Sequence, residues 1–308
     1  MSKKKKLNFY QKLSKKLSKR WVLYTLYVYY LLSKRCVSDN APLIISLTSY
    51  HKRFDVVYLV IEAIFQQNTD VNFQVVLTIA QQDIDIYGGL PKNIDPLIKR
   101  GLQLRVVDEN IKSYKKIYYI ANENHRKAII TIDDDIYYPN WWLQSMLDAV
   151  KDCPDTVLAY RGHYILQNNQ SLLDYKSWLE HSDDIYDNTP LFSFLPTGTS
   201  GVYYPVGSLN GLYDSKADFL NLCPCADDLW LKFICTENGI KGKRISVENL
   251  SFTELKSVDH LGRYNVAEGG NDVQFQNLMS HSTRFVSRIL SDSKSLPCQN
   301  RYKKSPIA

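Results

Sequence analysis

The chain lacks the features that typically mark zinc-binding, secreted or membrane-spanning proteins. Of its six cysteines, Cys223 and Cys225 are two residues apart, and no second pair stands at zinc-finger spacing. The apolar run Trp21–Leu32 has 12 residues, fewer than the ~20 that a helix needs to span a bilayer. No small-residue cleavage site follows this run, so we do not expect a signal peptide, and we expect the thiols to be reduced.

Acidic residues are missing from the first 35 positions, which hold nine lysines and two arginines. The rest of the chain has 27 basic and 32 acidic residues, so the net charge of +6 comes from the N-terminal arm. A nucleic-acid-binding protein is normally basic over its folded body, so we do not expect nucleic acid as a partner. Lysines beside an aromatic helix favour the headgroup region of an anionic membrane. We therefore expect residues 1–38 to form a basic arm and an amphipathic helix at the membrane surface. The alternative is a solvated basic tail whose helix packs on the domain.

Short apolar runs alternate with helical stretches from Ala41 onward. Continuous apolar strands separated by helices are typical of a mostly parallel sheet that is covered on both faces. The expected strands are Pro42–Thr48, Phe73–Ile79, Leu102–Val107 and Ala128–Ile132, and the expected helices lie at 55–67, 95–99, 113–124, 140–150 and 227–238. Beyond the last helix we expect no clear structure. The sequence thus predicts an α/β fold, with one domain over residues 41–285 and a tail over residues 286–308.

Three consecutive aspartates, Asp133, Asp134 and Asp135, directly follow the fourth expected strand. Like charges so close repel and raise one another's pKa, which favours a bound cation. Carboxylate oxygens suit Mg²⁺ or Mn²⁺, which typically bind one or two carboxylates together with substrate phosphates. The alternative is a cluster at the N-terminus of the next helix, which explains one aspartate better than three. Because ligands bind at the carboxyl ends of such strands, the triplet should lie on one rim with the segment Thr48–Tyr50.

The segment Ile132–Pro139 resembles the DxD motif of GT-A glycosyltransferases, in the family-2-like branch found in bacterial capsule, O-antigen and lipooligosaccharide biosynthesis. Four more segments occur in the order expected of that family, namely Ile44–Tyr50 with Arg53, Ser113–Lys116, Gly198–Gly201 and Ala226–Leu231. They are similar, in turn, to the nucleoside-binding loop, the lysine-bearing segment, the loop of the sugar pocket and the later acidic motif. The resemblance covers residues 42–275 and implies a GT-A (Rossmann-like) fold.

The resemblance also implies roles for the matching residues. Asp135 would ligate the metal, and Asp133 would contact either the metal or the ribose of the nucleotide. His260 would be a further metal ligand unless it is simply a structural histidine. Asp228 would be the general base, with Asp227 as the alternative, because the family pattern there is Glu-Asp. The residues that would bind the nucleotide sugar are Thr48, Ser49, Tyr50, Arg53, Lys115, Lys116, Asp133, Asp134, Gly198 and Gly201. For the two lysines the alternative is a surface pair.

What the resemblance implies as a whole is a glycosyltransferase that depends on Mn²⁺ or Mg²⁺ and transfers a hexose or N-acetylhexosamine. The donor would be a nucleotide sugar, expected to be a UDP-sugar, and the acceptor a lipid-linked or surface-polysaccharide glycan at the cytoplasmic face of the cell membrane. An aspartate base would fit inversion at the anomeric carbon. Two alternatives are a non-catalytic, membrane-associated carbohydrate-binding protein of the same fold and a glycoside hydrolase, which needs two carboxylates but no metal. A protein that had lost its activity would be expected to lose one acidic motif, and both are present.

Overall fold

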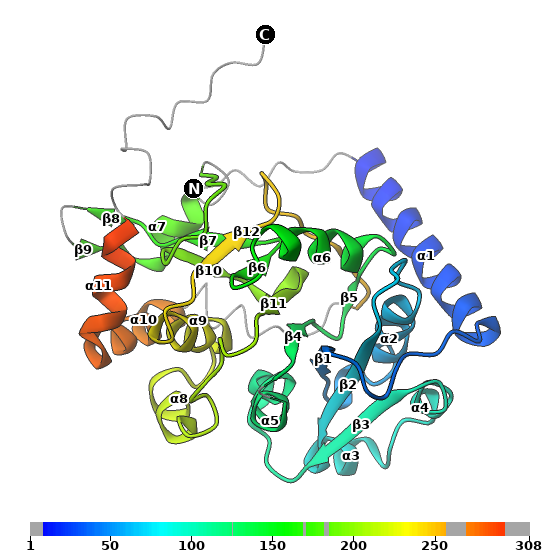
Figure 1. The fold of residues 1–308 in the computed structure, drawn as a ribbon. Helices are drawn as coiled ribbons and strands as arrows, with labels where there is room; N and C mark the ends of the chain where they lie inside the picture. The colour runs from blue at the N-terminus through cyan, green and yellow to red at the C-terminus, as the bar shows by residue number, and fades with distance from the viewer. Residues whose placement is uncertain (1–8, 125, 169–170, 182–184, 257–268, 293–308) are drawn as a thin grey trace.

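The protein is described here by a computed structural model that covers residues 9–124, 126–168, 171–181, 185–256 and 269–292 (Figure 1). At its centre is a seven-stranded sheet in the order β12 (Gly242–Arg244), β6 (Val157–Ala159), β11 (Val202–Tyr204), β4 (Ala128–Thr131), β1 (Leu43–Thr48), β2 (Phe73–Ala80) and β3 (Leu102–Val107). Strand β11 runs antiparallel to β4 and β6, and the other neighbouring strands are parallel. The predicted α/β fold with a mostly parallel sheet is therefore confirmed.

Helices and short strand pairs surround this sheet. The further helices are α3 (Gln81–Tyr87), α4 (Asp95–Ile98), α6 (Trp142–Asp152), α7 (Tyr175–Glu180) and α8 (Lys216–Leu222), and the 3₁₀ turns are η1 (His51–Arg53), η2 (Lys92–Ile94), η3 (Lys112–Lys116) and η4 (Gly198–Ser200). The antiparallel pairs are β5 (Ile136–Tyr137) with β13 (Thr253–Glu254), β7 (Gly162–Tyr164) with β10 (Phe194–Pro196), and β8 (Gln167–Asn168) with β9 (Ser171–Leu172).

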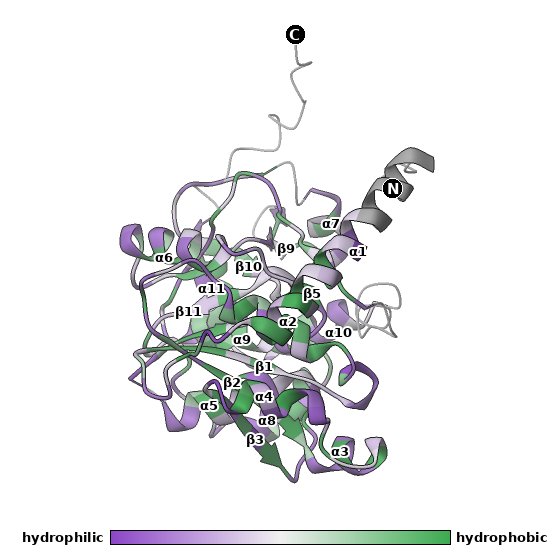
Figure 2. Ribbon diagram, turned by 90° about the vertical axis from the view of Figure 1, so that its right-hand side faces the viewer, coloured by the Kyte–Doolittle hydropathy of each residue, from purple (hydrophilic) through white to green (hydrophobic). Residues whose placement is uncertain are grey.

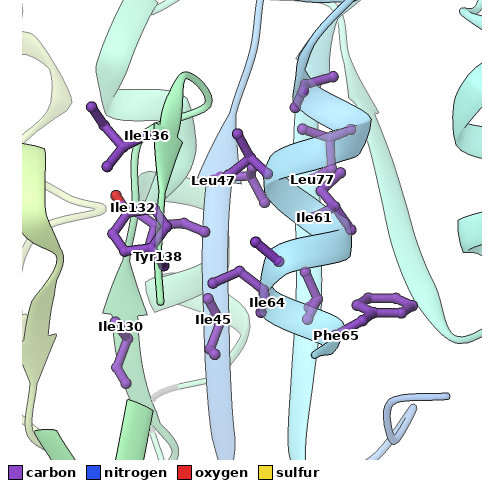
Figure 3. Packing of buried hydrophobic residues seen from close by; sticks show 14 of the residues in the cluster. Ile45, Leu47, Ile61, Ile64, Phe65, Leu77, Ile130, Ile132, Ile136 and Tyr138 are labelled. Carbon is purple, nitrogen blue, oxygen red and sulfur yellow. The ribbon is translucent and has the colours of Figure 1, made fainter. Parts of the chain in front are cut away.

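Apolar side chains cover both faces of the parallel half of the sheet. Helix α2 (Val57–Phe65) lays Ile61 and Ile64 over Ile45 and Leu47 of β1 (Figure 3). On the opposite face, Ile120 of α5 (Tyr118–Glu123) packs with side chains of β1, β2 and β4. Burial on both faces explains why these strands read as continuous apolar runs in the sequence. The same packing holds in place the end of β4, after which the acidic triplet follows.

The C-terminal third is more regular than the sequence indicated. Helix α9 (Asp227–Glu237) was expected, but α10 (Gly270–His281) and α11 (Thr283–Ser291) follow it, so the expectation of no clear structure was wrong. Phe275 and Phe285 from these two helices are buried in one apolar cluster with Phe233 of α9, and this packing stabilises both helices. The hydrophobic residues of α9 are green in Figure 2. The expected boundary between residues 285 and 286 falls within α11.

Helix α1 (Phe9–Leu32) lies along the outside of α2 (Figure 1). Leu26 is buried against the domain core, and the rings of Tyr30 and Tyr58 meet edge to face at 4.8 Å. Its outward side leaves Trp21 69% and Leu32 74% exposed. None of the helices in the described part of the chain is both long and apolar enough to cross a bilayer.

Candidate active site

The predicted site residues gather where the order of the strands reverses. After β1 the chain adds β2 and β3 on one side, and β4 then returns to the other side of β1. Open α/β sheets bind ligands at such a point, outside the carboxyl ends of the strands. Ser46 of β1 pairs in register with Thr131 of β4, so the segments that follow the two strands leave the sheet next to each other. One segment carries Ser49 and Arg53, and the other carries the aspartate triplet.

Arg53 holds two aspartates of the triplet at once. Its Nη1 lies 2.6 Å from Asp134 Oδ1 and its Nη2 lies 2.8 Å from Asp135 Oδ2. The Ser49 hydroxyl donates a hydrogen bond of 2.5 Å to the other oxygen of Asp134. Both aspartates are only 4% exposed. Burial raises the pKa of Asp135 to about 7 even though Arg53 opposes this shift. Both carboxylate oxygens of Asp134 are therefore bound by protein groups, whereas Arg53 contacts only one of the two carboxylate oxygens of Asp135.

Asp133 is joined to the later acidic motif by Lys116. The Nζ of Lys116 lies 3.4 Å from Asp133 Oδ1 and 3.0 Å from Asp227 Oδ2. Although burial opposes its charge, Asp227 and Asp133 raise the pKa of Lys116 well above its ordinary value. The backbone N–H of Asp133 donates to the Tyr138 hydroxyl at 3.0 Å. A buried, fully charged lysine thus connects two motifs that are almost a hundred residues apart in the sequence.

Asp228 completes the cluster on the side of the glycine-containing loop. Its Oδ2 accepts a hydrogen bond of 3.0 Å from the Gly198 N–H, at the start of η4. A Cβ added at Gly198 would lie 3.1 Å from Lys116 Nζ, 3.2 Å from Asp228 Oδ1 and 3.7 Å from Asp133 Oδ1. Burial and the neighbouring charge of Asp227 raise the pKa of Asp228 to about 7. Both acidic motifs therefore converge around position 198.

The two aspartates at the start of α9 differ in their surroundings. Asp227 accepts a hydrogen bond of 2.8 Å from the Ser113 hydroxyl and faces Lys116. Asp228 faces the Gly198 N–H instead. Asp227 thus has a cation and a hydroxyl to stabilise its charge, and Asp228, with its raised pKa, is the better placed of the two to take up a proton at neutral pH.

Lys115 and Lys116 turn to different partners. The Nζ of Lys115 lies 2.5 Å from Asn110 Oδ1 and 3.5 Å from Asp83 Oδ2. His51 Nδ1 lies 2.8 Å from the other oxygen of Asp83. Lys115 therefore belongs to a polar cluster beyond the ends of β2 and β3 and does not face the later acidic motif. Asp83 was not singled out from the sequence, although an acidic residue shortly after the end of β2 was the available signal.

The remaining predicted residues line the rim or support it. The Thr48 hydroxyl donates to the backbone carbonyl of Thr78 at 2.7 Å, which ties β1 to β2. Tyr50 meets His51 edge to face at 5.5 Å. Gly201 has a φ of +90°, and a Cβ there would lie 2.4 Å from a ring carbon of Trp142. Glycine is required at 201 so that the loop can lie against α6. His260 lies outside the described residues.

Asp133 and Asp135 fit a hard divalent cation by their chemistry. Mg²⁺ usually takes one or two carboxylates, with waters and substrate phosphates completing its shell. Within the described residues, no three His, Cys, Asp or Glu side chains are grouped to hold a metal ion. Glu254 of β13 is a further carboxylate close enough to raise the pKa of Asp135, and it was not singled out from the sequence. The donor set therefore suits a metal that is shared with a phosphate ligand, provided that Asp135 is released by Arg53.

A pocket of about 500 Å³ lies on another side of the molecule, between α1 and α2. Trp21, Tyr29 and Tyr137 are among its lining residues, together with the amide side chains of Gln66 and Asn140. Its lining includes none of the predicted site residues that the structure describes. The acidic cluster and this pocket are thus separate features.

No protein-family model and no curated protein matches the chain. Among solved structures, TarS 1–349 from S. aureus in complex with UDP is 12% identical, with 82% of this chain and 72% of that chain covered and a TM-score of 0.43. A mannosyltransferase from Pyrobaculum calidifontis, in complex with GDP-Man and Mn²⁺, is 11% identical, with 94% of this chain and 87% of that chain covered and a TM-score of 0.47. TarS 1–349 in complex with UDP-GlcNAc is 13% identical, with 71% and 60% covered and a TM-score of 0.45. Similarity at this level does not assign the chain to a family.

Proposed function

We propose that the protein is a metal-dependent glycosyltransferase of the GT-A type. The observation that supports this most is the meeting of the two acidic motifs around Gly198, with Lys116 between Asp133 and Asp227. Transfer from a nucleotide sugar needs cationic groups for the leaving diphosphate and a base for the acceptor hydroxyl within one cleft. The cluster offers both, and it lies at the strand ends where α/β sheets bind nucleotides.

The donor would lie along the rim from β2 to β4. Tyr50, His51 and Asp83 offer an aromatic ring and hydrogen-bonding groups suited to a nucleoside, and UDP is the nucleotide we expect. Asp133 and Asp135 would hold Mn²⁺ or Mg²⁺, which when bound neutralises charge on the diphosphate. Lys116, which is 5% exposed, adds a fixed positive charge next to the diphosphate. A fixed charge in a site that excludes water stabilises a leaving diphosphate more than a solvated one does.

Asp228 acts as the general base in this proposal. The acceptor oxygen forms a bond to the anomeric carbon, the bond from that carbon to the diphosphate oxygen breaks, and its electron pair leaves with the nucleotide. The hydroxyl proton passes to an oxygen of Asp228, whose pKa of about 7 lets it exchange protons near neutral pH. A single displacement of this kind inverts the anomeric configuration. The Gly198 N–H orients the carboxylate through its bond to Oδ2.

The acceptor would be a lipid-linked or surface-polysaccharide glycan at the cytoplasmic face of the cell membrane. The eleven positive charges of residues 1–35 and the exposed Trp21 and Leu32 of α1 support binding to an anionic surface. Each lysine near such a surface contributes on the order of 1 kcal/mol at low salt. Peripheral attachment through α1 would keep the enzyme where lipid-linked acceptors are found.

Nucleotide release from a panel of UDP-, GDP- and dTDP-sugars, measured with Mn²⁺ and with excess chelator, tests the proposal. We expect turnover with the metal and loss of turnover with the chelator. Asp228→Asn should lower kcat by about 10²- to 10⁴-fold, the range typical of a general base. Asp148→Asn is the matched control, because Asp148 lies on the surface of α6 and contacts Lys151 at 2.8 Å and Gln144 at 2.9 Å on the same helix. Equal activity of the two variants, or full activity in chelator, would contradict the proposal.

A further inference from the structure

Arg53 occupies the carboxylate that the proposed metal needs. Its Nη2 lies 2.8 Å from Asp135 Oδ2, while its Nη1 lies 2.6 Å from Asp134 Oδ1. The guanidinium is largely buried, with 13% of its side chain exposed, and each aspartate side chain is 6% exposed. Charge-assisted hydrogen bonds to arginine are among the stronger polar contacts in proteins, and they keep the guanidinium in one orientation. Arg53 is thus a cation that contacts both of these aspartates.

We propose that Arg53 acts as an exchangeable internal cation, which leaves Asp135 when a divalent metal ion binds there and stays attached to Asp134. This inference rests on the proposed function, because it requires that Asp135 takes a metal ion. Arg53 would then be a positioning residue for the donor site, in contact with both aspartates before the metal ion binds and with Asp134 alone afterwards.

Electrostatics favours exchange over simultaneous binding. A guanidinium and a divalent ion on one buried carboxylate would place two cations a few ångströms apart with little water between them, and like charges at that range repel strongly. Asp134 keeps two partners of its own, Arg53 and the hydroxyl of Ser49 at 2.5 Å. The planar guanidinium can therefore pivot about its Nη1 contact with Asp134, which moves Nη2 away from Asp135.

After the exchange, Nη2 of Arg53 would remain at the rim of the donor site. Arg53 ends η1, directly after β1, and its guanidinium lies 5.5 Å from the ring centre of Tyr50. A guanidinium presents a planar set of N–H donors that matches phosphate oxygens. Nη2, once it leaves Asp135, is thus available to donate hydrogen bonds to the diphosphate of a nucleotide. Metal binding would in this way prepare the nucleotide site before the donor arrives.

Direct titration with Mn²⁺ and no nucleotide tests the exchange. Arg53→Gln removes the competing cation and keeps an amide at that position, so we expect it to bind Mn²⁺ about tenfold more tightly than the unaltered protein, since one charge-assisted hydrogen bond no longer has to break. Arg105→Gln is the matched control, because Arg105 pairs with Glu123 on the edge strand β3 with an Nη1–Oε1 distance of 2.7 Å. Its Mn²⁺ affinity should not change.

The outcomes separate this inference from the proposed function. Equal or weaker Mn²⁺ binding by Arg53→Gln would overturn the exchange and leave the metal site standing. Absence of Mn²⁺ binding by every variant would overturn the exchange together with the metal part of the proposed function.

A second readout uses the unaltered protein and does not depend on whether the glutamine variant folds. Saturation with diamagnetic Mg²⁺ should shift the side-chain ¹⁵N signals of Arg53, assigned by their loss in Arg53→Lys. Arg53 signals that stay unchanged while Mg²⁺ binds would overturn the exchange.

Discussion

The titration of Asp228 gives the most detailed prediction. Burial and then the charge of Asp227 raise the pKa of Asp228 from 3.8 to about 7, and Lys116 opposes that shift. A base must be deprotonated to accept a proton, so kcat should rise with pH through about 7 and level off above it. The profile of kcat reports groups in the enzyme–substrate complex, in which Asp135 is expected to be engaged by the metal. The inflection in kcat can therefore be ascribed to Asp228.

Two substitutions should move this inflection in opposite directions. Asp227→Asn removes a negative charge next to Asp228, keeps an oxygen for the Ser113 hydroxyl, and should lower the inflection. Lys116→Met removes the positive charge and should raise it. Burial is the largest cause of the raised pKa and the neighbouring charges contribute less, so we expect each substitution to move the inflection by on the order of one pH unit, or about 1.4 kcal/mol.

The assay is kcat against pH between 5 and 9 for the unaltered protein and the two charge variants, with Asp228→Asn as reference. Absolute rates matter less than the position of the inflection, because Lys116→Met is also expected to slow the departure of the diphosphate. An inflection that stays in place in both variants would refute the charge coupling. An inflection that persists in Asp228→Asn and disappears in Asp227→Asn would make Asp227 the base.

Four further predictions concern stability, the metal ligand and the membrane. The folded-state pKa of Asp228 lies above its unfolded value, so the folded protein binds an extra proton between about pH 4 and 7, and its stability falls as pH rises through that window. Asp228→Asn should therefore unfold at a higher urea concentration than the unaltered protein at pH 8, but not at pH 4. Equal urea midpoints at pH 8 would contradict this. Gly201→Ala should lower the free energy of unfolding by about 2 kcal/mol or more, because it combines a positive φ with a contact of 2.4 Å to Trp142, whereas Gly207→Ala, whose Cβ would have its nearest neighbour at 3.7 Å, should cost less in the same urea titration. Asp135→Ala should abolish metal-dependent turnover, and retained turnover would exclude Asp135 as a metal ligand. The double variant Trp21→Ser and Leu32→Ser should sediment less with vesicles of three parts phosphatidylcholine and one part phosphatidylglycerol; equal sedimentation would exclude these side chains as membrane contacts.

The parallel half of the fold could be predicted from the sequence because its strands are buried on both faces. Leu102–Val107 has the predicted bounds, and β1 and β4 differ from theirs by one residue. Strands β6, β11 and β12 have three residues each, too few to show a period of their own. Helix α10 shows little amphipathic pattern of its own and depends on packing against α9, a contact between distant segments that no local pattern contains.

The candidate site divides in the same way. The aspartate triplet and the later acidic pair could be picked out as charges next to apolar runs. The contacts that bring these two acidic motifs together could not be predicted, because they join segments that are distant in the sequence. Neither the Lys116 bridge from Asp133 to Asp227 nor the Arg53 contact with Asp135 follows from spacing. Lys115 and Lys116 are adjacent and read alike in the sequence, and only the fold separates their partners.

The central claim is that both acidic motifs form one donor site. Anomalous diffraction at the manganese edge, from crystals grown with UDP and Mn²⁺, tests it most directly. We expect a manganese peak at Asp133 and Asp135, with the diphosphate of UDP between that peak and Lys116. Manganese or UDP found instead in the pocket between α1 and α2, with the carboxylates of the triplet still bound to Arg53, would contradict it.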